Sequence, residues 1–98
     1  FFRAAEQGYA DAQFNLGLMY ANGEGVEQDM SRAVELFKKA AEQGHVDAQN
    51  NLGAMYFTGD GVTRDEKKAI EWFEKAAAQG NEDAQANLDA IRAAGKSR

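Results

Sequence analysis

One stretch of this sequence occurs three times at a fixed spacing of 36 residues. Residues 47–56 read DAQNNLGAMY, residues 11–20 read DAQFNLGLMY, and residues 83–92 read DAQANLDAIR. When residues 8–43 are aligned with residues 44–79, 20 of the 36 positions are identical. A period of this length is typical of a solenoid, a stack of similar units in which each unit buries its apolar surface against its neighbours. The repeat therefore constrains the fold before any local pattern is considered.

The period divides the chain, residues 1–98, into the units of a single repeat domain. Residues 1–7 align with the ends of the later units, so we expect them to be the end of a helix from a truncated preceding unit. Residues 8–43 and 44–79 form two full units, and residues 80–98 form a half unit with a C-terminal cap. Because the chain begins without Met and inside a predicted helix, we expect it to be a fragment of a longer protein. Its compartment is therefore not indicated by the absence of a signal peptide.

The first helix of each unit is predicted from the spacing of its apolar residues. In the first unit, residues at i, i+4, i+7 and i+8 share one face of a helix over residues 10–21: Ala12, Leu16, Met19 and Tyr20. Gly17 lies beside this stripe and recurs as Gly53. Because glycine inside a helix costs about 1 kcal/mol relative to alanine, its recurrence predicts a close approach between helices.

Second helices are predicted over residues 30–43 and 66–79. Asp29 and Asp65 precede them and are suited to cap their first N–H groups. A last helix is predicted over residues 82–94. We therefore expect an all-α solenoid of 36-residue helix-turn-helix repeats.

The net charge of −5 and the pI near 4.8 argue against nucleic acid as a partner, because nucleic acid requires clustered Lys and Arg. They also argue against an anionic membrane surface. No apolar run approaches the roughly 18 residues that are needed to span a bilayer, so membrane insertion is not expected. The absence of cysteine excludes disulfides but does not fix a compartment.

The repeated residues resemble the Sel-1-like repeat, a close relative of the tetratricopeptide repeat. The second unit carries the signature at Ala48, Leu52, Gly53, Met55, Tyr56, Gly59, Gly61, Val62, Asp65, Ala69, Phe73, Ala76 and Ala77. The proline that often follows Gly-Val in the family is absent, and Glu27 and Thr63 stand in its place. The third unit departs from it at Asp89 and Arg92, where the other units have glycine and tyrosine, which is typical of a terminal cap. The resemblance implies an α/α superhelix whose first helices line a concave groove. It also implies an adaptor or scaffold for proteins or peptides, of a kind that is often bacterial; cytoplasmic, periplasmic and secreted locations all remain open.

Residues opposite the apolar stripe vary between units, which predicts a recognition surface rather than a stacking surface. The candidate groove residues on this face and its flank are Phe14, Asn15, Leu18, Asn50, Asn51, Ala54, Phe57 and Asn87. Three of these side chains, Phe14, Leu18 and Phe57, are apolar and could form an exposed apolar patch on this face. They could instead pack against neighbouring helices or be scattered surface residues. The recurring asparagines at positions 15, 51 and 87 could hold a peptide backbone, or could form hydrogen bonds between units.

No residue pattern indicates catalysis, a cofactor or a metal. His45 is the only histidine and no cysteine accompanies it, so a role at the start of a helix is the simpler interpretation. The Gly-x-Gly loops lack the residues of a phosphate or calcium loop. Ser31 is not followed by the lysine of a Ser-x-x-Lys motif. We therefore do not expect an enzyme.

The sequence leaves two functions open. The first is a non-enzymatic adaptor that binds a peptide or protein segment in the concave groove. The second is a structural spacer within a longer repeat protein, with no binding surface of its own. The open first end of the stack, with Phe1 and Phe2, also predicts self-association.

Overall fold

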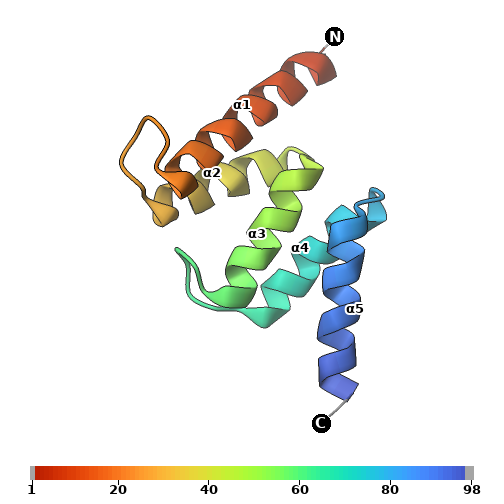
Figure 1. Ribbon diagram of the computed structural model, residues 1–98. Coiled ribbons are helices and arrows are strands. Elements are labelled where there is room, and N and C mark those ends of the chain that lie inside the picture. Colours follow the sequence, from red (N-terminus) through yellow and green to blue (C-terminus); the bar gives the residue numbers. More distant parts are fainter. Residues whose placement is uncertain (1, 97–98) are drawn as a thin grey trace.

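The computed structural model describes the backbone of residues 2–96 and the side chains of residues 9–94. Within that part of the chain all regular structure is helical. The five helices follow one another in the order α1 (Phe2–Asn22), α2 (Met30–Glu42), α3 (Val46–Thr58), α4 (Glu66–Ala78) and α5 (Glu82–Lys96). Each helix packs against the next one in sequence, as Figure 1 shows. The predicted all-α stack of 36-residue repeats is confirmed.

The predicted caps of the second helices are confirmed. Asp29 accepts a hydrogen bond from the backbone N–H of Arg32 at 3.2 Å, and Asp65 accepts the equivalent bond from Lys68 at 3.1 Å. These side chains satisfy N–H groups that the first turn of a helix cannot pair internally. Both second helices end one residue earlier than predicted, because Gln43 and Gln79 form their C-caps.

The close approach predicted at the two helical glycines is also confirmed. A Cβ atom on Gly17 would lie 2.8 Å from Cε1 of Phe37, and one on Gly53 would lie 2.8 Å from Cδ1 of Phe73. Each phenyl ring lies against the bare backbone of its partner helix. This contact lies inside a repeat, and it fixes how α1 packs on α2 and how α3 packs on α4.

The core is built from buried residues of all five helices. It consists of small and large apolar side chains: Ala10, Ala33, Val34, Phe37, Ala40, Ala41, Ala48, Leu52, Met55, Tyr56, Ala69, Phe73, Ala76, Ala84 and Leu88. The many alanines allow helices to pack at short distance, while Phe37 and Phe73 fill the space within each repeat. The core therefore runs through the stack and is shared by neighbouring repeats.

The boundary predicted before the first full unit is wrong in one respect. The sequence predicts that one helix ends near Gly8 and another begins at residue 10, but α1 runs without interruption from Phe2 to Asn22. At the later boundaries, His45 and Asn81 each accept a hydrogen bond from the backbone N–H three residues ahead. Tyr9 occupies the same position, and its phenolic oxygen cannot reach back to cap a helix. The chain therefore keeps the internal hydrogen bonds of a continuous helix.

The side chains of Phe1 and Phe2, on which part of the self-association prediction depends, lie outside the described residues. No helix in the described part of the chain is both long enough and apolar enough to cross a membrane.

Candidate binding groove

The three first helices carry the same kind of stripe on one face. Residues at i, i+4, i+7 and i+11 share a helix face. On α3 these are Asp47, Asn51, Ala54 and Thr58, and on α5 they are Asp83, Asn87, Ala90 and Ala94. On α1 the equivalent residues are Asp11, Asn15, Leu18 and Asn22. Each stripe begins with an aspartate, continues with an asparagine and then becomes apolar or uncharged.

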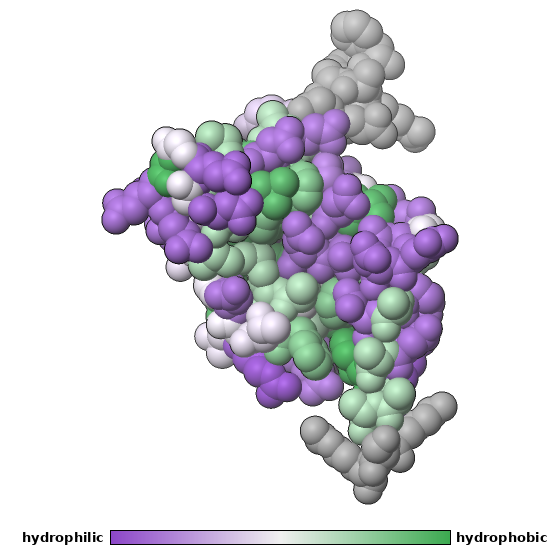
Figure 2. Space-filling model, in the orientation of Figure 1, coloured by the Kyte–Doolittle hydropathy of each residue, from purple (hydrophilic) through white to green (hydrophobic). Residues whose placement is uncertain are grey.

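A pocket of about 310 Å³ lies between α3 and α5 at the apolar part of these stripes. Its lining comes from three helices: Ala54, Phe57, Thr58, Phe73, Asn87, Ala90, Ile91 and Ala94. Figure 2 shows apolar side chains over the part of the surface where Figure 1 places α5. Three of the predicted groove residues, Ala54, Phe57 and Asn87, are brought together here from two different repeats.

The polar groups of this pocket are mostly engaged within the protein. The Thr58 hydroxyl donates to the carbonyl of Ala54 at 3.0 Å, and the Asn87 amide donates to Oδ1 of Asn50 at 3.2 Å. Phe57 is held from outside the pocket by Arg64, whose guanidinium lies 5.7 Å from the ring centroid and donates to the Phe57 carbonyl at 3.0 Å. The remaining lining is hydrocarbon, so the pocket is suited to an apolar group.

The pocket exists because alanines face each other at this junction. Ala54 on α3 and Ala90 on α5 are equivalent positions of successive repeats, and both are exposed. In the first repeat the same position is Leu18, which is half-buried and packs against the core. The variable residues opposite the apolar stripe thus change the depth of the groove from one repeat to the next.

Phe14, another predicted groove residue, belongs to the packing between repeats. Its ring lies 5.5 Å from the ring of Phe37 and is stacked on the imidazole of His45 at 4.5 Å. The alternative that the sequence left open, packing against neighbouring helices, therefore describes Phe14. At the next junction the equivalent position is Asn50, which forms a hydrogen bond instead of an aromatic contact.

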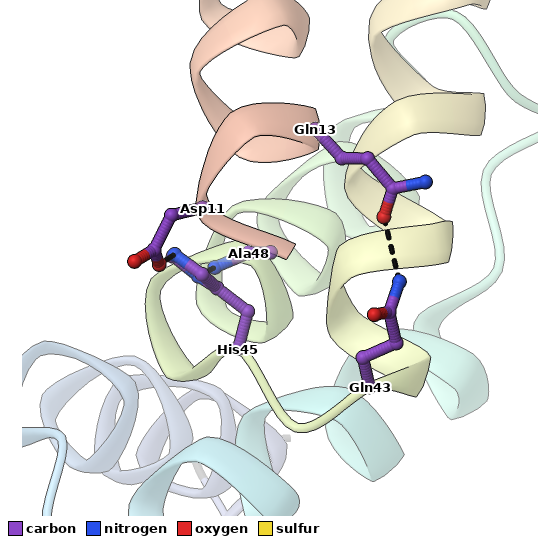
Figure 3. Close-up of polar contacts among 5 residues, drawn as sticks. All are labelled: Asp11, Gln13, Gln43, His45 and Ala48. Atoms are coloured by element: carbon purple, nitrogen blue, oxygen red, sulfur yellow. Dashed lines mark hydrogen bonds and ion pairs between the residues drawn. The ribbon is translucent and has the colours of Figure 1, made fainter. Parts of the chain in front are cut away.

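His45 joins two repeats and also caps α3. Its Nδ1 accepts from the backbone N–H of Ala48 at 3.1 Å, which requires that nitrogen to be unprotonated. Its Nε2 lies 2.9 Å from Oδ1 of Asp11 (Figure 3), so the ring proton resides on Nε2 and is donated to the carboxylate. The predicted role at a helix start is confirmed, and the contact with Asp11 across the repeat boundary is additional.

Two pairs of glutamines, which were not predicted from the sequence, each join the first helix of a repeat to the C-cap of its second helix. Gln43 donates to Oε1 of Gln13 at 2.7 Å (Figure 3), and Gln79 donates to Oε1 of Gln49 at 2.8 Å. Gln49 is buried, and its own amide donates to the carbonyl of Ala41. The signal was present in the sequence, because glutamine recurs at both positions of every complete repeat.

The three recurring asparagines, Asn15, Asn51 and Asn87, do not make the same contacts. Asn87 donates across the repeat boundary to Asn50, which is the alternative that the sequence left open. Asn51 is half-buried and Asn15 is exposed, and the described residues give neither amide a side-chain hydrogen bond. One repeat earlier, the residues equivalent to Asn87 and Asn50 are Asn51 and Phe14. Because Phe14 is apolar, it cannot accept the hydrogen bond that Asn50 accepts from Asn87. Within the described residues, the Asn51 amide therefore lacks the partner that Asn87 has in Asn50.

No three His, Cys, Asp or Glu side chains gather as a possible metal site within residues 9–94. The chain matches the Sel1 repeat family over residues 10–45 and 46–81, and no enzyme family was found. No curated protein matches the chain.

Three similar solved structures come from bacteria. A protective antigen of uropathogenic Escherichia coli that displays an SLR fold is 52% identical with a TM-score of 0.78; the match covers 84% of this chain and 18% of the antigen. A Sel1 repeat protein from Oxalobacter formigenes is 36% identical with a TM-score of 0.85, covering 88% of this chain and 35% of that protein. Helicobacter pylori cysteine rich protein B is 35% identical with a TM-score of 0.78, covering 81% and 59%.

The chain thus spans less than two thirds of each of these proteins. Repeats of this kind generally mediate protein interactions and are generally non-catalytic. The repeat signature, the sequential packing of the five helices and the two matched segments agree, and the chain belongs to the Sel1 repeat family.

Proposed function

We propose that the chain is a non-catalytic interaction module that binds a peptide or protein segment along the face formed by α1, α3 and α5. One observation carries the proposal: an apolar pocket of about 310 Å³ is assembled from two repeats on this face. Ligand pockets typically combine such a lining with a few polar groups, here the side chains of Thr58 and Asn87. An apolar side chain of a bound segment fits this site best.

The experiment must block the pocket without damaging the core. Phe14 and Phe57 are unsuitable, because both are half-buried against the core and a charge there would destabilise the fold. Ala54→Glu and Ala90→Glu are better choices, since both alanines are exposed on helices and both line the pocket. The matched control is Ala78→Glu, which makes the same change at an exposed position of α4 outside the pocket.

The measurement is selection from a displayed library of random peptides, about twelve residues long, on the immobilised protein; such a peptide can span the length of α3. Selected peptides are then titrated against all variants, after circular dichroism has shown that each is folded. We expect both pocket variants to weaken binding at least about tenfold, because the introduced carboxylate would face an apolar side chain. Ala78→Glu should bind like the wild type. Peptides that bind all variants equally, or a selection that enriches none, would contradict the proposal.

A structural spacer is the second candidate function. It is favoured by the use of Phe14 and Asn87 in contacts between repeats, which leaves fewer groove residues available to a partner. Under this alternative the selection would yield no peptide whose binding is weakened by Ala54→Glu or Ala90→Glu.

A further inference from the structure

We infer that the segment bound in this groove carries a lysine or arginine three to five residues away from a large apolar side chain. The apolar side chain would occupy the pocket between α3 and α5, and the basic side chain would contact Asp47 and Asp83. This inference rests on the proposed function and specifies the chemistry of the partner.

The spacing follows from helix geometry. Asp47 precedes the pocket residues Ala54 and Phe57 by seven and ten positions on α3, which corresponds to roughly 10–15 Å at the helical rise. Asp83 precedes Ala90 and Ala94 by seven and eleven positions on α5. Figure 1 shows α3 and α5 running in the same general direction, so both aspartates lie at the same end of the groove. An extended peptide covers this distance in about three to five residues.

The charges on this face favour a cation at that end. Asp47 and Asp83 are both exposed, and no ion pair among the described residues involves either of them. The stretches Tyr9–Asn22 and Val46–Thr58 contain no lysine or arginine. On α5, Arg92 is turned toward α4, where it pairs with Glu74 at 3.5 Å. Arg64 lies at the other end of this face, against the ring of Phe57. Within the described residues, Asp47 and Asp83 therefore present carboxylates that no ion pair neutralises.

The middle of the groove can hold the backbone between the two anchor side chains. Asn51 lies one helical turn from both Asp47 and Ala54, and its half-buried amide has no side-chain hydrogen bond within the described residues. An amide offers a donor and an acceptor together, which match the N–H and C=O of an extended chain. The order along the groove is therefore carboxylate, amide and apolar pocket.

Both aspartates also stabilise their helices, because each lies in the first turn and faces the positive end of the helix dipole. The carboxylate oxygens can still accept hydrogen bonds from a bound cation while they stabilise the helix. A test must therefore separate binding from stability.

The composition of the selected peptides gives the first test. We consider the peptides whose binding is weakened by Ala90→Glu. We expect them to be enriched in lysine or arginine at three to five positions from a leucine, isoleucine, methionine or phenylalanine. Enrichment of apolar residues alone, or of acidic residues, would overturn this inference and leave the proposed function standing. Failure to enrich any peptide would overturn both.

The second test uses one enriched peptide and the double variant Asp47→Asn, Asp83→Asn. We expect its affinity to fall by about threefold to tenfold, the size typical of one or two exposed charge pairs. Raising the salt from about 0.05 to about 0.5 M should weaken wild-type binding by a similar factor and leave the double variant nearly unchanged.

The matched control is Glu35→Gln, Glu71→Gln, which removes two exposed carboxylates from equivalent positions of α2 and α4. It should bind like the wild type, because the net charge changes equally but the groove does not. Equal losses in both double variants would indicate a general charge effect and would overturn the inference. So would unchanged affinity in the groove variant.

Discussion

The first helices of the two complete repeats carry the same apolar residues in very different surroundings. Leu52 and Met55 on α3 have exposed fractions of 0% and 7%, whereas their equivalents Leu16 and Met19 on α1 have exposed fractions of 39% and 37%. The difference does not come from the contacts within a repeat. Gly17 and Gly53 meet their phenylalanines at the same distance, so α1 packs on α2 as α3 packs on α4.

The second helix of the preceding repeat accounts for the difference. Helix α2 packs against α3 and covers its apolar stripe, while no described helix packs on the equivalent side of α1. The comparison separates two sets of residues that a repeat alignment treats alike. One set holds a repeat together, and the other joins successive repeats and gains its stability only from a neighbour.

The largest expected effect is a difference between two leucine substitutions. Leu52→Ala removes a fully buried side chain and should lower the free energy of unfolding by about 2–5 kcal/mol. Leu16→Ala should cost about 1 kcal/mol or less, because that side chain is already partly in water. Urea denaturation followed by circular dichroism measures both. Equal costs would mean that the stripe of α1 is covered in solution.

The two helical glycines should behave alike, in contrast to the leucines. Gly17→Ala and Gly53→Ala each place a methyl group 2.8 Å from a phenylalanine ring, which should cost about 1–3 kcal/mol from overpacking. The better helix propensity of alanine offsets about 1 kcal/mol of this. We expect the two net losses in the same urea experiment to agree closely. A markedly smaller loss at Gly17 would show that α1 packs loosely on α2.

The smallest effect on stability, and the clearest effect on association, is expected on the open face of α1. The double variant Leu16→Lys, Met19→Lys should change the free energy of unfolding by about 0.5 kcal/mol or less per site, because both side chains are partly exposed. It should weaken the self-association that the sequence predicts for the open first end of the stack with Phe1 and Phe2, because Leu16 and Met19 lie on the exposed apolar stripe of the helix at that end.

Sedimentation velocity over a range of concentrations measures this association. The control is Ser31→Lys, Thr63→Lys, which adds the same charge at exposed positions away from the stripe. A wild type that stays monomeric at every concentration would refute the prediction of self-association, and equal dissociation in both variants would assign it to charge alone.

Much of the fold could be predicted because the repeat supplies three aligned versions of one unit. The helices, the aspartate caps of α2 and α4 and the close approach at Gly53 all follow from residues that recur with local consequences. The helix end predicted near Gly8 is wrong, also for a local reason, because α1 continues through this residue. Tyr9 cannot supply the cap that His45 and Asn81 provide, and this difference is present in the sequence.

The candidate site was predicted less completely. Three of the eight predicted groove residues, Ala54, Phe57 and Asn87, line one pocket, and the prediction that this face binds a partner stays a prediction. Periodicity could not distinguish Phe57 from Phe14, because both lie on the same face of their helices. Their roles depend on which residue of the next repeat stands opposite: His45 provides a flat ring for Phe14, whereas Ala90 leaves space beside Phe57.

The sequence by itself determined the repeat, the helices and their order, because hydrogen bonding and capping act over a few residues. Only the tertiary structure decided which copies of a repeated residue are buried, which asparagine is paired and where the groove deepens into a pocket. These properties depend on contacts between residues from different repeats, some 30 or more positions apart, such as Phe14 with His45 and Asn87 with Asn50. A repeated sequence specifies the same side chain each time, but the energy of that side chain is set by the neighbour that covers it.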